Sequence, residues 1–160
     1  MKNHIRQDIE LYGKRILESK EFAAAFGQRH HYRTTVGDHS LRVTRASLRL
    51  LYLLEKLGLD LDHQSMVEAG LCHDLGMIGR KEKFKRGRDC IGLHPVHSAE
   101  IADRILGYKN PKRETIIRRH MWPLSKKAPH SWEEGIITVA DKYASLVDVI
   151  KPKVKRHEDY

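Results

Sequence analysis

The residues of this sequence that are candidates for catalysis or metal binding are histidines and aspartates. Their spacing would place them on the inward faces of helices. His73 and Asp74 are adjacent in the otherwise apolar stretch AGLCHDLGMIGR. Burying two neighbouring ionisable groups costs free energy unless a hydrogen-bond partner or a metal ion compensates. Imidazole and carboxylate groups together suit divalent transition metals, and a carboxylate can bridge two of them. The pair therefore indicates either a local hydrogen bond or a metal centre.

Four more such residues lie on apolar helical stripes elsewhere in the sequence: His39, His97, His120 and Asp141. His39, for example, precedes Val43 and Ala46 by 4 and 7 residues, which is the spacing of one helix face. A single inward histidine is more often a hydrogen-bonded core residue than a metal ligand. Several of them, with no obvious Lys or Arg on the same stripes, would destabilise the fold unless a cation were bound. The set as a whole favours a bound metal.

Six of the remaining histidines divide into two groups. Five fall in predicted turns or tails, where a solvated role is expected: His30, His31, His63, His130 and His157. His94 precedes Pro95 at a predicted helix start, three residues before His97. For His94 a structural role and a contact to a ligand or substrate are equally open.

The elements that must position these side chains are helices. Helical periodicity dominates, and no segment shows the sustained alternation of β-branched residues that is typical of strands. We predict an all-α domain of about six helices, near residues 3–26, 38–58, 62–75, 94–107, 110–122 and 131–150. The N-terminal signals are Asp38 as a cap, Asn110 followed by proline, and Ser131 with a glutamate three residues later.

Length and composition set the broad class. The 160 residues, 40% hydrophobic and 32% charged, fit one globular domain over 1–160, with a core near 33–150 and a polar tail at 151–160. Lys and Arg outnumber Asp and Glu by 30 to 21, and the formal charge of +9 favours an anionic partner. The few aromatic residues do not alternate with basic runs, so nucleic acid is not the expected partner.

The expected compartment is the cytoplasm. Only two cysteines occur, Cys72 and Cys90, which is not the pattern of a disulfide framework. The N-terminus MKNHIRQDIE has no apolar signal core, and no run is long enough to cross a bilayer, so no membrane partner is expected. The first helix carries apolar residues that serve either the core or a homodimer contact, namely Ile5, Ile9, Leu17 and Phe22.

The order of His39, the pair His73-Asp74 and Asp141 resembles the HD-domain superfamily of metal-dependent phosphohydrolases. The flanking sequences GDHSLRV, LCHDLGMIG and ITVADKYASLVDV carry the likeness, which covers roughly residues 33–150. It implies an all-α fold with the signature H…HD…D on separate helices. It also implies a metal-dependent enzyme that hydrolyses a phosphoester of a nucleotide or another small phosphorylated metabolite.

His97 in HPVHSAE and His120 in IIRRHMWPL fall between the pair and the last aspartate, an order similar to the dinuclear branch of the superfamily. That likeness implies two divalent transition metals, iron or manganese. The implied ligands are His39, His73 and Asp141 for one metal, His97 and His120 for the other, and Asp74 as the bridge. The GYP stretch of the c-di-GMP phosphodiesterases is absent after His120, so that substrate is not expected.

Two bound metals can lower the pKa of a bridging water, and a metal-bridged hydroxide is then expected to attack phosphorus in line. Asp74 and Lys142 are the predicted catalytic residues. Asp74 anchors the nucleophile, and Lys142 neutralises a phosphate oxygen. The predicted substrate-binding residues are Arg33, Arg80, Lys81, Lys142 and His94. The basic run RKEKFKRGR at 80–88 is interpreted as solvated, with a lid as the alternative.

Two other functions fit the same ligands. Some dinuclear HD proteins are iron oxygenases, and such an enzyme would act on an anionic substrate such as a phosphonate. A metal-bound sensor or scaffold without catalysis is the second alternative. A requirement for oxygen separates the oxygenase from a hydrolase. Inactivity on a broad range of phosphoesters, with the metals bound, would favour the sensor.

Overall fold

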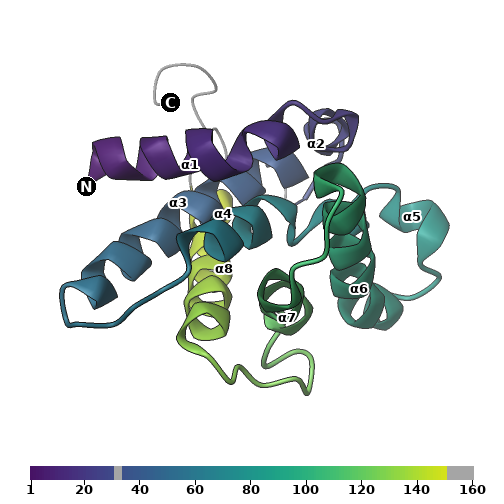
Figure 1. The fold of residues 1–160 in the computed structure, drawn as a ribbon. Coiled ribbons are helices and arrows are strands. Elements are labelled where there is room, and N and C mark those ends of the chain that lie inside the picture. Colours follow the sequence, from purple (N-terminus) through teal and green to yellow (C-terminus); the bar gives the residue numbers. More distant parts are fainter. Residues whose placement is uncertain (31–33, 151–160) are drawn as a thin grey trace.

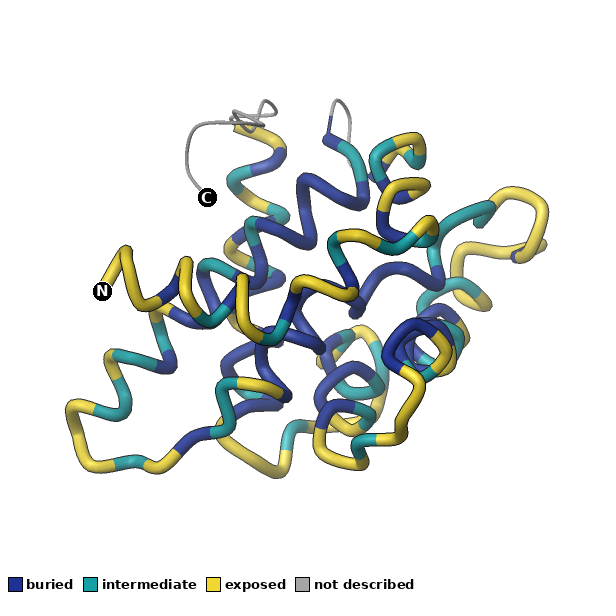
Figure 2. Tube along the Cα trace, turned by 45° about the horizontal axis from the view of Figure 1, so that its top comes forward, coloured by how far each residue is buried: buried dark blue, intermediate teal, exposed yellow. Residues whose placement is uncertain are grey.

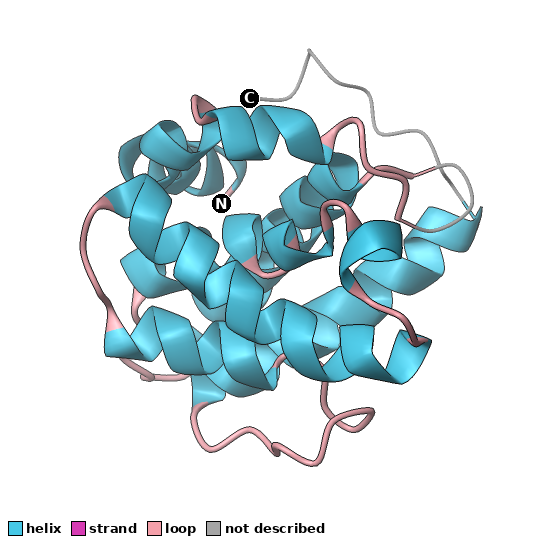
Figure 3. Ribbon diagram, turned by 90° about the vertical axis from the view of Figure 1, so that its right-hand side faces the viewer, coloured by secondary structure: helices cyan, strands magenta, loops and turns pink. Residues whose placement is uncertain are grey.

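The computed structural model describes residues 1–30 and 34–150, and over these residues the chain forms helices joined by loops, without a strand (Figure 3). The prediction of an all-α fold is confirmed. The elements are α1 Lys2–Leu17, α2 Lys20–Ala25, α3 Val36–Glu55, α4 His63–Cys72, η1 Leu75–Met77, α5 Arg80–Lys83, α6 Gly87–Leu106, α7 Pro111–Arg119 and α8 Trp132–Ile150 (Figure 1). In the described part of the chain no helix is long and apolar enough to cross a membrane.

The centre of the fold is the short helix α4. It packs against α3, α1 and α7, and α3 also packs along α8. Enclosed in this way, α4 is buried from Ser65 to Cys72. Figure 2 shows the buried segments gathered in the middle of the molecule and the exposed ones at its loops and ends. Because α4 ends inside the protein, the HD pair that follows it is buried as well.

Two glycines allow backbones to approach closely around the HD pair. A Cβ on Gly70 would lie 3.0 Å from the Cα of Thr44, so α3 and α4 meet closely there. A Cβ on Gly76 would overlap the carbonyl oxygen of His94, and the Gly76 N–H donates to the Oγ of Ser98 at 2.8 Å. These contacts bring α3 and α6 to the HD pair from two sides.

The first half of the chain departs from prediction at two helix starts. The predicted helix 3–26 is two helices, because Ser19 caps α2 by accepting a hydrogen bond from the Phe22 N–H at 3.1 Å. A serine hydroxyl competes with the backbone for hydrogen bonds, which favours a cap over a helix interior. α3 begins earlier than predicted, because Thr35 rather than Asp38 is its cap.

α6 differs most from its predicted range. It begins at Gly87, not at His94, and Pro95 lies in its interior. Proline removes a helical hydrogen bond, which is why the sequence favoured a helix start at this point. Packing against η1 and α7 holds the helix through the proline. The buried stripe of α6 consequently includes His94, Ser98, Ile101 and Ile105.

α4 and α7 both end before their predicted limits, and at each end the next residue is a candidate ligand. His73 directly follows α4, and His120 directly follows α7. The N-terminal signals of α7 and α8 are confirmed. Asn110 accepts two backbone hydrogen bonds at the start of α7, and Ser131 accepts one, at 3.2 Å, at the start of α8.

Candidate metal centre

Four histidines from four different helices meet in the interior at the HD pair. His39 lies in the first turns of α3, His94 lies on α6, and His73 and His120 follow the ends of α4 and α7. All four are at most 2% exposed. The ring centroids of His73 and His120 lie 4.9 Å apart, and those of His94 and His120 lie 5.2 Å apart. Segments far apart in the sequence thus converge on one buried point.

At the two helix ends, the backbone fixes the orientation of the imidazole. The Nδ1 of His73 lies 2.9 Å from the carbonyl oxygen of Gly70, and that of His120 lies 2.6 Å from the carbonyl oxygen of Ile117. Both carbonyls belong to the last turn of a helix, where backbone acceptors lack intrahelical partners. A carbonyl can only accept, so each Nδ1 carries the hydrogen and each Nε2 keeps its lone pair.

The other two histidines are oriented in the same sense. The Nδ1 of His94 lies 2.7 Å from the carbonyl oxygen of Cys90, and that of His39 lies 2.6 Å from Oδ2 of Asp148. Asp148 is fully buried, and its other oxygen forms an ion pair with Arg42. All four Nε2 atoms therefore point into the interior, and each offers a lone pair when its imidazole is neutral. This is the tautomer of a histidine that binds a metal through Nε2, with Nδ1 held by an outer partner.

Asp74 stands in the middle of these nitrogen atoms. Its Oδ1 lies 3.1 Å from Nε2 of His94 and 3.5 Å from Nε2 of His120. Its Oδ2 lies 3.5 Å from Nε2 of His73 and 3.8 Å from Nε2 of His39. The carboxylate thus divides the histidines into two pairs, one on each oxygen. A carboxylate placed in this way can bridge two metal ions.

Asp141 completes the ligand set from α8. Its Oδ1 lies 3.0 Å from Nε2 of His39 and 4.0 Å from Nε2 of His73. Within the described residues, three overlapping groups have ligand atoms close enough together to share an ion: His30, His39 and Asp74; His39, His73 and Asp141; His73, Asp74 and His120.

Two observations indicate that these residues fit a metal. The Nε2 of His73 is buried and has no hydrogen-bond partner within residues 1–30 and 34–150. The Nε2 atoms of His94 and His120 face each other at 3.2 Å. Because both Nδ1 atoms carry the hydrogen, the two Nε2 lone pairs would repel each other unless a proton or a cation lies between them.

The pKa values show which groups carry charge at neutral pH. Burial lowers the pKa of His73 to about 3, so its imidazole is neutral and available to a metal. Burial opposes the ionisation of Asp74, but His73 and hydrogen bonds from the other histidines hold its pKa well below the usual value. A similar balance, with His39 as the main partner, lowers the pKa of Asp141. Burial also lowers the pKa of His94, but hydrogen bonds, first that to Asp74, raise it to about 10.

The structure does not bring His97 to this cluster. His97 is half-buried, and its ring stacks on Phe84 with the centroids 5.7 Å apart. His94 occupies the position expected for His97, because the buried stripe of α6 passes through His94 and Ser98. The sequence had placed His94 among the substrate-binding residues.

His30, expected to be solvated, is buried at the centre. Its Nε2 lies 2.9 Å from Oδ2 of Asp74, and its ring stacks on that of His39 with the centroids 4.1 Å apart. Its backbone N–H donates to the carbonyl oxygen of Thr34 at 2.8 Å, which turns the chain back toward α3. His30 lies in a loop, so periodicity carried no signal for it. The available signal was its position just before the Thr35 cap.

The cationic residues that were predicted to bind substrate differ in how close they lie to the histidine–aspartate cluster. Lys142 lies at the centre: its Nζ is 2.6 Å from Oδ2 of Asp141 and 3.3 Å from the carbonyl oxygen of His120. Arg80 and Lys81 lie on α5, beyond α6 in Figure 1. In the described structure neither has a hydrogen bond or ion pair to the cluster. Arg33 lies outside the described residues.

The fold and this centre define a class of all-α proteins with a buried histidine–aspartate metal site. The model of the HD-domain family matches residues 36–146, and the chain belongs to that family. Members of the family are generally metal-dependent phosphohydrolases and bind divalent metals. Comparison with curated proteins and with solved structures gave no significant match.

Proposed function

We propose that this protein is a phosphohydrolase that cleaves a phosphoester of a nucleotide or another small phosphorylated metabolite. The observation that carries the proposal is the convergence of four histidine Nε2 atoms on the ionised carboxylates of Asp74 and Asp141. Membership of the HD-domain family supports the class of reaction. The formal charge of +9 suits an anionic substrate.

The donor set supports two divalent metal ions, with iron and manganese as the candidates. The proposed ligands are His39, His73 and Asp141 for one ion, His94 and His120 for the other, and Asp74 for both. When bound, such ions activate water and stabilise charge on the phosphoryl group. The assignment keeps the bridging role expected for Asp74 and gives the role expected for His97 to His94.

Two further residues act on the substrate and on the bridge. Lys142 is held beside Asp141, and its side chain is 40% exposed. Its ammonium group can therefore reach a non-bridging phosphate oxygen, where a charge-assisted hydrogen bond stabilises negative charge. On the opposite side, burial lowers the pKa of His30, and the neutral imidazole orients Asp74 through the contact of Nε2 with Oδ2. His30 is thus a positioning residue.

The experiment that tests the function combines metal analysis with a phosphoester screen. Protein purified without chelators should carry close to two transition-metal ions per chain. With manganese, or with iron loaded anaerobically, it should hydrolyse a phosphoester, and the rate should be the same with and without oxygen. Turnover that stops under anaerobic conditions would overturn the hydrolase and favour an oxygenase.

The ligand assignment is tested with a matched pair of variants on one helix. His94→Ala should release one metal ion per chain and lower kcat by roughly a hundredfold or more, because it removes a ligand. His97→Ala should keep both metals and the activity, because its ring contacts Phe84 and not the cluster. Metal loss in His97→Ala but not in His94→Ala would restore the assignment implied by the sequence.

A further inference from the structure

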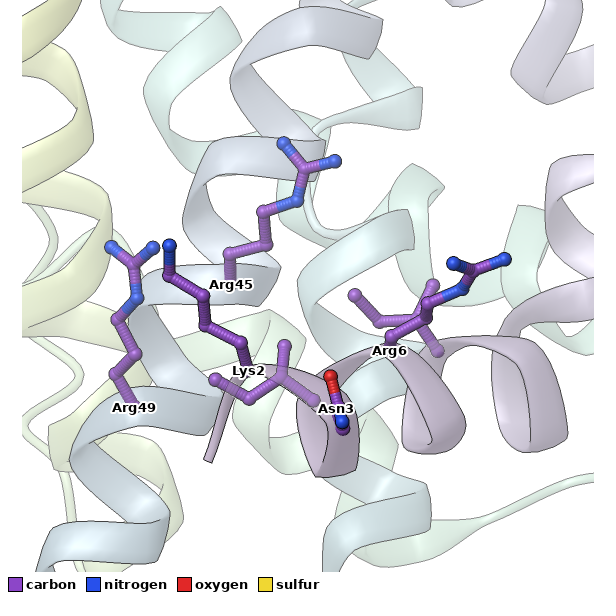
Figure 4. A pocket seen from close by; sticks show the side chains of 7 residues that line it. Lys2, Asn3, Arg6, Arg45 and Arg49 are labelled. Atoms are coloured by element: carbon purple, nitrogen blue, oxygen red, sulfur yellow. The ribbon is translucent and has the colours of Figure 1, made fainter. Parts of the chain in front are cut away.

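A second polar feature of the surface lies away from the metal centre, between the N-terminus of α1 and the middle of α3. A hollow of about 280 Å³ is lined by four cationic side chains over an apolar floor: Lys2, Arg6, Arg45 and Arg49 over Ile5 and Ile9 (Figure 4). Among residues 1–30 and 34–150, no carboxylate lines it. In Figure 4 the side chains of Lys2, Arg45 and Arg49 extend toward the same edge of the view.

Two of the four cations of this hollow have no ion pair among the described residues. Arg6 pairs with Glu10 at 2.8 Å, but this pair is exposed and screened by solvent. Lys2 and Arg49 form no ion pair with any residue of 1–30 or 34–150. Cations gathered in one concave site repel each other, and the potential they create raises the local concentration of anions.

The start of α1 adds to the positive potential. Its cap, Met1, has no side-chain hydrogen bond to the helix, and the first turn holds no acidic residue. The N–H groups of a first helical turn lack backbone partners, and the helix dipole places partial positive charge there. Together with the four cations, this helix end is suited to the oxygen atoms of a phosphate group.

The cationic surface continues past the hollow. A smaller hollow of about 190 Å³ shares Arg45 and Arg49 and is also lined by Arg42 and by Tyr143 of α8. Residues 42, 45 and 49 are three and four positions apart, so they share one face of α3. Arg42 itself pairs with Asp148, so the cations that line the larger hollow are Lys2, Arg6, Arg45 and Arg49, and a set this extended matches linked phosphates better than a single phosphate. The planar guanidinium group of arginine, with its several N–H donors, suits phosphate oxygen atoms.

We propose that this hollow binds the phosphate chain of a polyphosphorylated small molecule at a site separate from the metal centre. Arg45 and Arg49 follow His39 by six and ten residues, which is about 9 and 15 Å along the helix axis. They face the start of α1, whereas His39 faces α4 and α8. The site does not depend on the proposed hydrolase activity.

The test is calorimetric titration with sodium tripolyphosphate and, separately, with adenosine triphosphate. The wild-type protein and Asp74→Asn should both bind, because the site does not use the metal centre. The double variant Lys2→Gln/Arg49→Gln should bind both probes at least tenfold more weakly. A control with the same change in net charge, Arg104→Gln/Lys109→Gln, alters exposed cations near the end of α6 and should bind within twofold of wild type.

Three outcomes would overturn the proposal. Equal weakening in the two double variants would mean that only net charge matters. Loss of binding in Asp74→Asn alone would assign the anion to the metal centre, and it would leave the proposed hydrolase intact. Binding of neither probe to the wild-type protein would show that no such site exists. Circular dichroism of each variant checks that it is folded.

Discussion

Asp148 of α8 is the carboxylate that contacts the imidazole of His39. The Nδ1–H of His39 donates to its carboxylate at 2.6 Å, whereas His73, His94 and His120 donate to backbone carbonyls. A carboxylate partner fixes the ring and makes the opposite nitrogen a stronger donor to a metal. Arg42 forms an ion pair with the same carboxylate, which is buried.

Asp148→Asn should therefore weaken metal binding by about 10- to 100-fold without removing a ligand, because an amide polarises His39 less than a carboxylate does. The measurement is a competition titration with a chelator of known affinity. Glu134→Gln, another buried carboxylate of α8, provides the control, because it contacts the His130 N–H and not the centre. Wild-type affinity in Asp148→Asn would show that Asp148 does not support His39.

At the residue scale, the sequence was sufficient to predict the members of the buried cluster that lie on periodic stripes. His39 and Asp141 lie on helix interiors, and their stripes could be read from spacing alone. On α6, His97 lies about one turn before Ile101 and His94 about two turns before it, so spacing alone allowed either histidine to face inward. His30 lies in a loop, and its burial follows from a tertiary contact with Asp74 that periodicity does not encode.

At the element scale, the contact between η1 and α6 sets the position of His94. Gly76→Ala would place a Cβ against the His94 carbonyl oxygen and 2.9 Å from the backbone nitrogen of Ser98. Because backbone must move to admit it, we expect a loss of about 1–3 kcal/mol in the free energy of unfolding. Metal affinity should fall as well.

The control for this change is Gly92→Ala, an exposed position inside α6 where a Cβ meets nothing within 4 Å. Alanine in a helix interior is favoured over glycine, so this variant should be more stable by roughly 0.5–1 kcal/mol. Chemical denaturation measures both variants. A Gly76→Ala protein as stable as the wild type would show that the two backbones are not tightly packed.

Three helices are joined at a site that does not belong to the metal centre. His63, at the start of α4, lies between Asp8 of α1 at 2.9 Å and Glu55 of α3 at 2.7 Å. Tyr52 also donates to Asp8, at 2.6 Å. Burial lowers the pKa of His63, but the two carboxylates outweigh burial and raise it above the ordinary value of 6.5.

A raised pKa in the folded state means that protonated His63 stabilises the fold. This contribution is fully present below the unfolded pKa of about 6.5 and is lost as the pH rises through the folded value. His63→Gln should therefore lower Tm more at about pH 6 than at about pH 9, relative to the wild type. A Tm difference independent of pH would contradict this account.

The helices themselves were predictable from apolar periodicity, and their starts from capping residues. The errors at helix starts occurred where Ser19 capped a helix inside a predicted one, where two caps competed, and where a proline suggested a start. Thr35 and Asp38 are both good caps, and only the observed hydrogen bond from the Asp38 N–H to Thr35 distinguishes them. The packing of α6 against η1, which sustains the helix through Pro95, involves residues that no local pattern connects.

For the whole molecule, the centre gathers ionised carboxylates and imidazole nitrogen atoms in its interior. A metal that binds only the folded state stabilises it by mass action, by about 2.7 kcal/mol at a concentration one hundred times the dissociation constant. For a chain of 160 residues this corresponds to a rise in Tm of roughly 5–10 °C. Thermal unfolding with manganese and with a chelator measures the difference, which should be absent in Asp74→Asn.

The hydrogen bonds from His73 and His120 to the last-turn carbonyls of α4 and α7 have a consequence for local motion. If either helix frays at its C-terminus, the carbonyl moves and the imidazole loses its orientation. An ion held by both histidines would therefore restrain fraying at both helix ends together. Amide hydrogen exchange near residues 72–74 and 119–121 should slow in concert when the ion binds, as if two distant chain segments shared one terminal cap.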